Sequence, residues 1–291
     1  MIGIVSALGA SLSWTFACFI WREQTIFNKP LEINFLKNII AFLIFSPILF
    51  FINFNLNTQY IIILCISGII GIGLGDTFYL KSLNIIGTRK TLSIEAISPI
   101  IAAIVGELFI NEYLSLRSWV GILIVSSSLF VIIKRQSFLS DGKETLFNNS
   151  FKFKNYMYAF LSVLCAVAAA LLSRLVLISS QLTPIQTTEI RLAGAIFFLL
   201  LISKCKPNFF IRHLNKKTSL KFIISVFLGT NIGIYLQQVV FETLPLGIGW
   251  ALLSSSPLFS LLFAKREEGI LTKDIIFLTF SLFVGIILII L

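Results

Sequence analysis

The chain contains ten apolar stretches, each about as long as a helix that crosses a bilayer. A spanning helix needs roughly 20 mainly apolar residues. Membrane strands are excluded because they alternate apolar and polar residues over about ten positions. The chain is 57% hydrophobic and 12% charged, which is more apolar than a water-soluble core can absorb. We therefore expect an all-α integral membrane protein with ten transmembrane helices. The expected helices cover residues 2–21, 33–53, 60–80, 90–110, 116–134, 155–178, 184–203, 219–241, 247–264 and 273–291.

Matching residues divide the chain into two halves, residues 1–135 and 155–291, joined by a basic polar loop at 136–154. Five pairs recur at corresponding places: Pro30 and Pro184, Lys37 and Arg191, Gly71 and Gly229, Gly75 and Gly233, and Pro99 and Pro257. A chance alignment of two apolar sequences is the alternative, since few other residues are identical. Because each half has an odd number of predicted helices, the second half enters the membrane from the opposite side. The pattern predicts two inverted five-helix repeats, which are typical of secondary transporters.

Basic residues are concentrated on one set of loops. The loops after the odd-numbered predicted helices, together with the helix ends that adjoin them, hold 19 of the 23 Lys and Arg residues, and the other loops with their helix ends hold one, Arg117. Cytoplasmic loops are enriched in Lys and Arg, so this bias predicts that both termini lie outside. No aromatic-rich recognition module accompanies the net charge of +10. We therefore attribute the basic loops to attraction by anionic lipid headgroups rather than to nucleic acid.

Several ionisable residues lie within the predicted spans or at their ends. A charge in the membrane is costly, so it usually faces a bundle interior or a water-filled path. These residues are Lys37, Asp76, Lys81, Glu95, Glu107, Arg174, Glu189 and Arg191. Structural ion pairs, or side chains that reach the interface, are the alternative. Pro99 cannot donate to the carbonyl of Glu95, four residues earlier, so we expect a helix kink there and another at Pro257. Kinked helices are tolerated in membranes where they line a cavity.

Polar and aromatic residues near these positions are candidates for substrate binding or for coupling. The candidates are Trp14, Lys37, Asp76, Tyr79, Glu95, Arg191, Asn231, Tyr235, Trp250 and Ser254. The aromatic residues have an alternative role in packing or in the interfacial belt. The single His213 lies in a basic loop, and the four cysteines are widely spaced. We therefore expect no metal site, no disulfide framework and no cofactor.

Residues 98–132, SPIIAAIVGELFINEYLSLRSWVGILIVSSSLFVI, resemble the fourth and fifth helices of EamA-type transporters in the drug/metabolite transporter superfamily. The match lies in Pro99, in Glu112 thirteen residues later and in Gly121 nine residues after that. Lys37 and Arg191 also match the basic residue typical of the family's second and seventh helices. The second half keeps Pro257 and Gly285, but its KREEG motif places Glu267 and Glu268 two to three positions early. That half is therefore the looser match.

The resemblance implies a ten-helix inverted repeat that moves small metabolites by alternating access, commonly for export. It implies that Glu112 is a helix-end residue rather than a substrate ligand. It also implies that both termini are cytoplasmic, which is opposite to the orientation predicted from loop charge. The two orientations remain open at this point.

We expect a secondary transporter, not an enzyme, that exports a small solute across a bacterial inner membrane. The alternative is a membrane enzyme or flippase that acts on lipids or polyprenyl-linked sugars. An enzyme would need converging acid, base or metal groups, which the sequence does not show. A membrane carboxyl group can take up a proton on one side and release it on the other. We therefore expect Glu95, or Asp76 as the alternative, to couple solute movement to protons.

Overall fold

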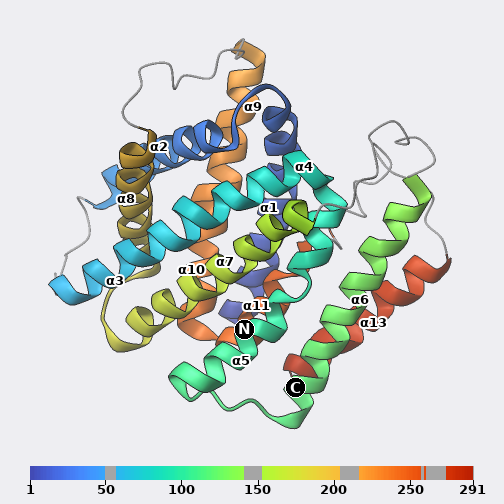
Figure 1. Cartoon of the computed structure of the whole chain (residues 1–291). Helices are drawn as coiled ribbons and strands as arrows, with labels where there is room; N and C mark the ends of the chain where they lie inside the picture. Colours follow the sequence, from blue (N-terminus) through green and yellow to red (C-terminus); the bar gives the residue numbers. More distant parts are fainter. Residues whose placement is uncertain (50–56, 141–152, 204–215, 257–258, 260–272, 291) are drawn as a thin grey trace.

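The computed structural model describes residues 1–49, 57–140, 153–203, 216–256, 259 and 273–290. Within these ranges the chain forms a bundle of helices and contains no strand (Figure 1). The helices and the π-helical segments η1 and η2 are α1 (Ile2–Phe27), α2 (Pro30–Leu49), α3 (Thr58–Gly68), η1 (Ile69–Gly75), α4 (Asp76–Glu95), α5 (Ser98–Ile110), α6 (Leu116–Ser140), α7 (Phe153–Ser179), α8 (Pro184–Ser203), α9 (Lys216–Val226), η2 (Phe227–Ile232), α10 (Gly233–Thr243), α11 (Leu246–Leu253) and α13 (Lys273–Ile290). The all-helical fold predicted from the sequence is confirmed for this part of the chain.

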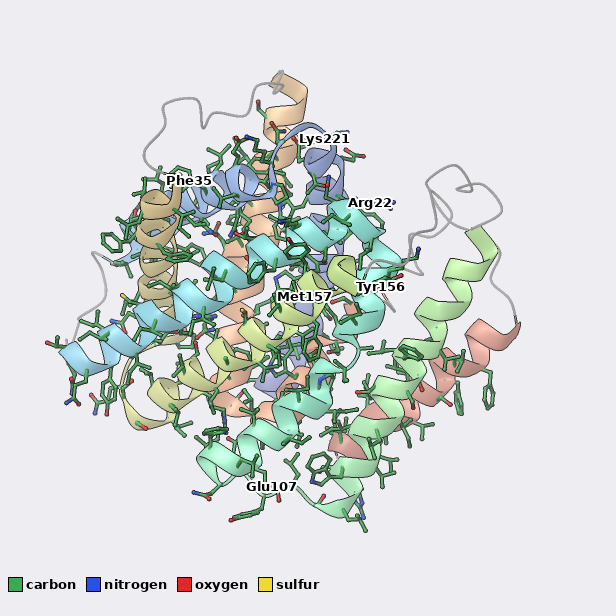
Figure 2. All side chains as sticks on the ribbon, in the orientation of Figure 1. Arg22, Phe35, Glu107, Tyr156, Met157 and Lys221 are labelled. Atoms are coloured by element: carbon green, nitrogen blue, oxygen red, sulfur yellow. The ribbon has the colours of Figure 1, made fainter. Side chains whose placement is uncertain are left out.

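Six helical stretches of the described residues are long and apolar enough to cross a membrane. They are Ile2–Thr25, Pro30–Leu49, Thr58–Gly87, Tyr156–Ser179, Pro184–Ser203 and Ser219–Thr243. Large apolar side chains cover the outside of the bundle; Leu108, Phe197 and Phe280 are 71, 62 and 66% exposed. A continuous apolar surface of this kind is a membrane-facing surface rather than a water-facing one. The chain is therefore a multi-pass integral membrane protein. Figure 2 shows the basic residues Arg22 and Lys221 at the end of the bundle opposite Glu107.

The third predicted span is longer than expected. Helix α3, segment η1 and helix α4 follow one another directly, and the first non-helical backbone comes at Gly87, with φ 77° and ψ 169°. This conformation is open to glycine and strained for other residues. Gly87 therefore provides the kink that separates this span from the next one.

A second break lies between Glu95, the last residue of α4, and Ser98, the first residue of α5. Pro99 is thus near the N-terminus of a new helix, where a missing N–H leaves no bond unmade. The helix is therefore interrupted just before Pro99 rather than bent within one continuous helix. The Ser98 hydroxyl donates to the Glu95 carbonyl at 2.6 Å, so that acceptor is satisfied. The corresponding prediction at Pro257 lies outside the described residues.

The two halves repeat local features at a constant separation of 158 residues. Segment η1 begins at Ile69 and η2 begins at Phe227. Helix α4 ends at Glu95 and α11 ends at Leu253, and the helix is interrupted after both. A π-helical turn and a helix break are uncommon features, so their equal spacing is more informative than residue identity.

Each π-helical segment packs on the first helix of the other half. A side chain at Gly71 of η1 would overlap with Ala169 of α7, and one at Gly229 of η2 would overlap with Ala17 of α1. Glycine at these places lets the helix backbones approach closely. The two halves therefore cross at two equivalent contacts.

Helices α1 and α7 point in opposite directions. The start of α1 lies at the end of α10, where Gly3 packs against Thr243 and Leu244. The end of α7 lies there too, because the Arg174 Nη1 group donates to the Phe241 carbonyl at 2.5 Å. One end of the bundle thus contains the start of the first helix of one half and the end of the first helix of the other.

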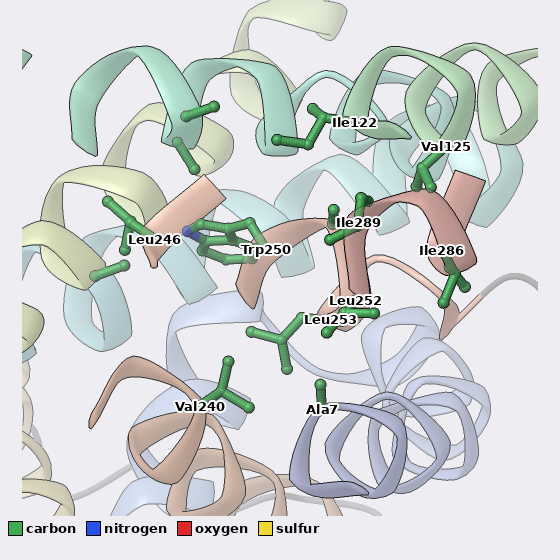
Figure 3. Packing of buried hydrophobic residues seen from close by; sticks show 14 of the residues in the cluster. Ala7, Ile122, Val125, Val240, Leu246, Trp250, Leu252, Leu253, Ile286 and Ile289 are labelled. Carbon is green, nitrogen blue, oxygen red and sulfur yellow. The ribbon is translucent and has the colours of Figure 1, made fainter. Parts of the chain in front are cut away.

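The core at this end combines small and large residues from both halves (Figure 3). Ala7 of α1 and Ala103 of α5 are buried in one cluster with Val240, Leu246 and Trp250 of the second half. Close packing of small residues is a main source of helix association in membranes. This cluster fills the bundle at the end where α1 begins.

Helices α6 and α13 form a pair at one edge of the bundle (Figure 1). Gly121 of α6 lies against the carbonyl of Gly285, and Gly285 lies against the carbonyl of Gly121, so the contact is reciprocal. Helix α6 continues through Ser140, and α7 begins at Phe153. The predicted connecting loop at 136–154 is therefore shorter at both ends than the sequence indicated.

Candidate substrate cavity

A cavity of about 200 Å³ lies among the helices and is lined by residues of both halves. The first half contributes residues from α1, α2, η1, α4, α5 and α6, and the second half contributes residues from α7, α8, η2, α10 and α11. Most of the lining is apolar, and a few polar and charged side chains are set into it. This composition is typical of a site for a small molecule.

Eight of the ten candidate residues selected from the sequence line this cavity. They are Trp14, Lys37, Asp76, Tyr79, Glu95, Arg191, Trp250 and Ser254. They come from five helices and from the turn after α11. The fold thus brings these candidates together, and their role in binding or coupling remains a prediction.

Asn231 and Tyr235 are not among the residues that line the cavity. Asn231 is fully buried, and its amide donates to the carbonyl of Ala41 on α2 at 2.8 Å. On the adjacent helix α10, Ile234 and Gln237 are the lining residues, and Tyr235 points about 100° away from Ile234. Asn231 thus belongs to the packing between η2 and α2, and Tyr235, which is partly buried, does not line the cavity.

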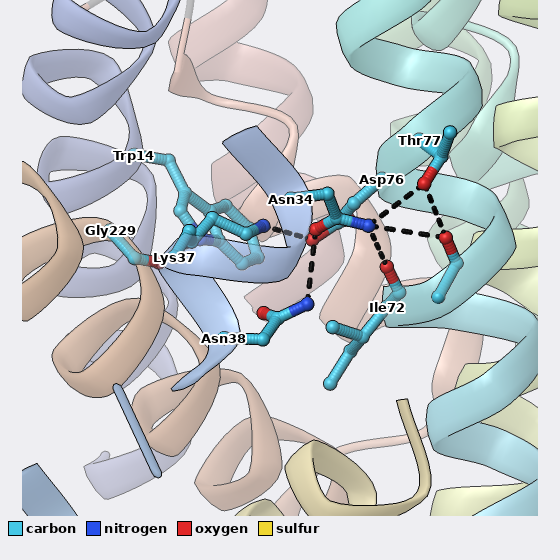
Figure 4. A network of polar contacts seen from close by, with 9 residues as sticks. Trp14, Asn34, Lys37, Asn38, Ile72, Asp76, Thr77 and Gly229 are labelled. Carbon is cyan, nitrogen blue, oxygen red and sulfur yellow. Dashed lines mark hydrogen bonds and ion pairs between the residues drawn. The ribbon is translucent and has the colours of Figure 1, made fainter. Parts of the chain in front are cut away.

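Lys37 of α2 forms an ion pair with Asp76, the first residue of α4 (Figure 4). The Lys37 side chain is 3% exposed and that of Asp76 is 34% exposed. The Lys37 ammonium also lies 4.9 Å from the centroid of the Trp21 ring, within the range of a cation–π interaction. Lys37 therefore has an anionic partner and an aromatic one within the protein.

Asn34 fixes the position of this ion pair by binding the π-helical turn. Its amide nitrogen lies 2.7 Å from the carbonyl oxygen of Ile72, 3.1 Å from that of Gly73 and 3.0 Å from the hydroxyl of Thr77 (Figure 4). Asn38 donates in turn to the amide oxygen of Asn34 at 3.1 Å. A π-helical turn disturbs the regular helix hydrogen bonds, and Asn34 supplies a donor where backbone acceptors are left.

Glu95 lies at the C-terminal end of α4, at the helix break described above, and its side chain lines the same cavity as Asp76. No hydrogen bond or ion pair joins its carboxyl group to another side chain of the described ranges. Nearby, the Cys18 thiol and the Tyr79 hydroxyl lie 3.1 Å apart, within hydrogen-bond distance. Within the described part of the chain, the carboxyl group of Glu95 is thus available to a solute or a proton.

Arg191 of α8 is the second cation at the cavity, and it is 4% exposed. Its Nε and Nη1 atoms have no hydrogen-bond partner among the described residues. A side chain on Gly71 would come within 3.3 Å of its Nη2 atom. Glycine at this position therefore leaves room for the guanidinium group.

Glu189, two residues before Arg191, does not line the cavity. It is 1% exposed, and neither carboxylate oxygen has a partner within the described part of the chain. Arg174, by contrast, has a partner that the sequence did not reveal, because it forms an ion pair with Glu112. The pair lies eight residues along α7 from Ala166, the last α7 residue at the cavity, a distance of about 12 Å.

The indole groups at the cavity differ in their hydrogen bonds. The Trp14 indole N–H donates to the carbonyl of Gly229 at 2.9 Å, which connects α1 to η2. The indole nitrogens of Trp21 and Trp250 have no partner in the described ranges. Trp21, Cys18, Ser162 and Gln237 line the cavity although they were not selected from the sequence. Trp21 could have been selected, because it follows Trp14 and Cys18 on one helix face at spacings of four and three residues.

No group of three or more His, Cys, Asp or Glu residues within the described ranges is placed to hold a metal ion. The cavity offers the ammonium group of Lys37, the guanidinium group of Arg191, two carboxyl groups, hydroxyls and indoles. These groups can bind and release a polar solute.

Comparison with known proteins gives one result for the fold and another for the family. One solved structure, titled only "Crystal structure of protein", aligns with a TM-score of 0.77 over 98% of this chain and 95% of its own length, at 13% identity. That similarity concerns the fold alone. No protein with a curated description matches the chain. The model of the EamA-like transporter family matches residues 1–134. Over these residues, which make up less than half of the chain, the sequence is similar to the EamA-like transporters of the drug/metabolite transporter superfamily.

Proposed function

We propose that this protein is a secondary transporter that moves a small metabolite across the membrane by alternating access. The observation that carries the proposal is the cavity, which both halves line and into which Lys37, Asp76, Glu95 and Arg191 bring charged groups within the membrane bundle. Ionisable groups in such a place usually mark a solute or ion path. The match of residues 1–134 to the EamA-like transporter family supports the same function.

The proposed architecture is a ten-helix bundle of two inverted five-helix repeats. The equal spacing of the π-helical segments and of the helix breaks supports it. The opposite directions of α1 and α7 and the exchanged contacts of Gly71 and Gly229 also support it. In transporters of this architecture, one repeat rocks against the other around a site at their interface. The breaks after Glu95 and Leu253 are where we expect the helices to bend.

Glu95 is the proposed proton carrier, with Asp76 as the alternative. Asp76 is already paired with Lys37, whereas the carboxyl group of Glu95 has no such partner among the described side chains. A free carboxyl group can change its protonation state without breaking an ion pair. The arrangement therefore favours Glu95.

We propose export as the direction of transport and the bacterial inner membrane as the location. The export direction follows from the family resemblance. No contact within the described residues favours the alternative of a lipid-acting enzyme or flippase.

Reconstitution into sealed vesicles tests the transport function. Purified protein would be placed in proteoliposomes, and movement of a panel of small metabolites would be followed with and without a pH gradient. We expect at least one solute to cross faster than in protein-free vesicles, and to accumulate only when the gradient is present. If no solute of the panel crosses faster than in protein-free vesicles, the proposal is not supported.

A further inference from the structure

Among the described residues that line the cavity, the fully buried polar atoms without a hydrogen-bond partner are all donors. They are the Nε and Nη1 groups of Arg191, the indole N–H of Trp21 and the indole N–H of Trp250. The exposed fractions of these residues are only 4, 5 and 9%. A buried donor that bonds to nothing is unfavourable by about 1–3 kcal/mol, and more if it is charged. The three residues come from three helices and line one cavity, and the described part of the protein supplies no acceptor for these donors.

Charge leads to the same conclusion. The charged groups that line the cavity are Lys37, Asp76, Glu95 and Arg191. Lys37 is neutralised by Asp76 and also lies over an indole ring. Arg191 forms no ion pair with the described residues, and its guanidinium group cannot lose its proton in proteins. A buried cation without a paired anion is strongly destabilising, so an anion bound beside Arg191 would be favourable.

We infer that Arg191 is the centre of an oxyanion subsite, and that the transported solute carries a carboxylate or a phosphate monoester group that binds there. A guanidinium group matches two oxygens of such a group with two parallel N–H donors. The indole N–H groups of Trp21 and Trp250 supply further donors, and their rings supply apolar contact for the rest of the solute. That the bound solute is transported rests on the proposed function. Binding of the oxyanion at Arg191 does not depend on it.

The two carboxyl groups at the cavity, those of Asp76 and Glu95, would repel a bound anion when they are ionised. With Lys37, Asp76, Glu95 and Arg191 all ionised, the charges of the cavity cancel. The other titratable lining groups are the Cys18 thiol and the Tyr79 hydroxyl. An anion at Arg191 adds one negative charge, and a proton on Glu95 removes it again. Anion binding and protonation of Glu95 should thus favour each other, and this coupling is reciprocal. We expect oxyanion affinity to increase as the pH falls.

The experiment is a binding measurement on purified protein in lipid nanodiscs, with quenching of tryptophan fluorescence as the signal. The probes share one ring and differ in the head group: benzoate, phenyl phosphate, benzyl alcohol and benzylamine. We expect benzoate or phenyl phosphate to bind at least about tenfold more tightly than both benzyl alcohol and benzylamine, since hydrogen bonds to a charged group are worth about 1.5–3 kcal/mol. Tighter binding of one of the two anions identifies the head group as carboxylate or phosphate.

Two variants and a control test the residue. Arg191→Gln should reduce the affinity for the better anion by about tenfold or more, and Arg191→Lys should keep part of it. Arg117→Gln changes an exposed arginine outside the cavity and should leave the affinity unchanged. Equal binding of benzylamine and the anions by the wild type overturns the inference, as does unchanged anion affinity in a folded Arg191→Gln protein. Anion binding without transport in vesicles would instead contradict the transport proposal and leave the oxyanion subsite standing.

Discussion

Arg174 on α7 and Glu112, in the turn between α5 and α6, form an ion pair that joins the two halves of the chain. Both groups have a second partner: Glu112 accepts from the backbone N–H of Leu246 at 2.7 Å, and Arg174 donates to the carbonyl of Phe241 at 2.5 Å. The four residues lie together beyond one end of the cavity, at the end where α1 begins. In alternating access, this contact would have to open when the cavity becomes accessible from that side.

We predict that removing one partner of this pair destabilises the protein strongly. Arg174→Met leaves Glu112 as an unpaired carboxylate, and breaking a buried pair in this way costs about 3–5 kcal/mol. Glu112→Gln should cost less, because an amide oxygen can still accept from Leu246. The double variant should lose less stability than the sum of the two single variants, as measured by thermal unfolding in detergent. Additive losses would mean that the two side chains do not interact.

The second prediction concerns Lys37. Lys37→Ala should reduce transport without preventing membrane insertion, because it leaves Asp76 unpaired at the cavity and removes the cation beside Trp21. The protein with both Lys37→Ala and Asp76→Asn should be more stable than the one with Lys37→Ala alone, since no unpaired charge remains. Arg191→Ala should also reduce transport. Wild-type transport rates in both single alanine variants would assign these cations to packing alone.

The third prediction tests proton coupling at Glu95. Glu95→Gln keeps the size of the side chain but cannot ionise, so it should abolish accumulation driven by a pH gradient and retain downhill exchange of solute. Glu189→Gln is the matched control: it changes a buried glutamate that does not line the cavity, and it should keep gradient-driven accumulation. Accumulation with an unchanged pH dependence in Glu95→Gln would exclude Glu95, and the same result in Asp76→Asn would exclude proton coupling by either residue.

Orientation in the membrane is the subject of the fourth prediction. A cysteine introduced at Ser140, the last residue of α6, in a background without the native cysteines should react only from the cytoplasmic side. The reason is that the loops on this side carry nearly all of the basic residues. Labelling of intact cells by a membrane-impermeant reagent would reverse this orientation and would agree with the one implied by the family resemblance.

The last prediction concerns the kink at Gly87. Nothing lies within 4 Å of the place where a Cβ atom would be, so Gly87→Ala introduces no clash. Its effect should come from the backbone alone, with a loss of about 1–3 kcal/mol of stability, since φ is positive and ψ is near 170°. Gly75→Ala, which meets the Cys165 side chain at 3.2 Å, allows strain and crowding to be compared. A Gly87→Ala protein as stable as the wild type would indicate that the backbone can relax here.

The sequence by itself determined that the chain forms apolar helices long enough to cross a membrane, six of which lie in the described residues. Length and hydropathy predict them because a bilayer requires an unbroken apolar helix of a minimum length. Proline positions indicate where helices begin. Pro30 and Pro184 begin α2 and α8, and Pro99 lies at the start of α5. These effects are local, since a missing N–H acts within one helical turn.

Only the tertiary structure decided which faces of these helices meet. In a membrane protein, apolar residues face both the lipid and the core, so hydrophobic periodicity does not show which side turns inward. For this reason Asn231 and Tyr235 were assigned to a site that Trp21 and Gln237 line instead. The pairing of Arg174 with Glu112 joins residues 62 positions apart in the chain. Such a contact depends on how the two halves pack against each other, which no local pattern of residues specifies.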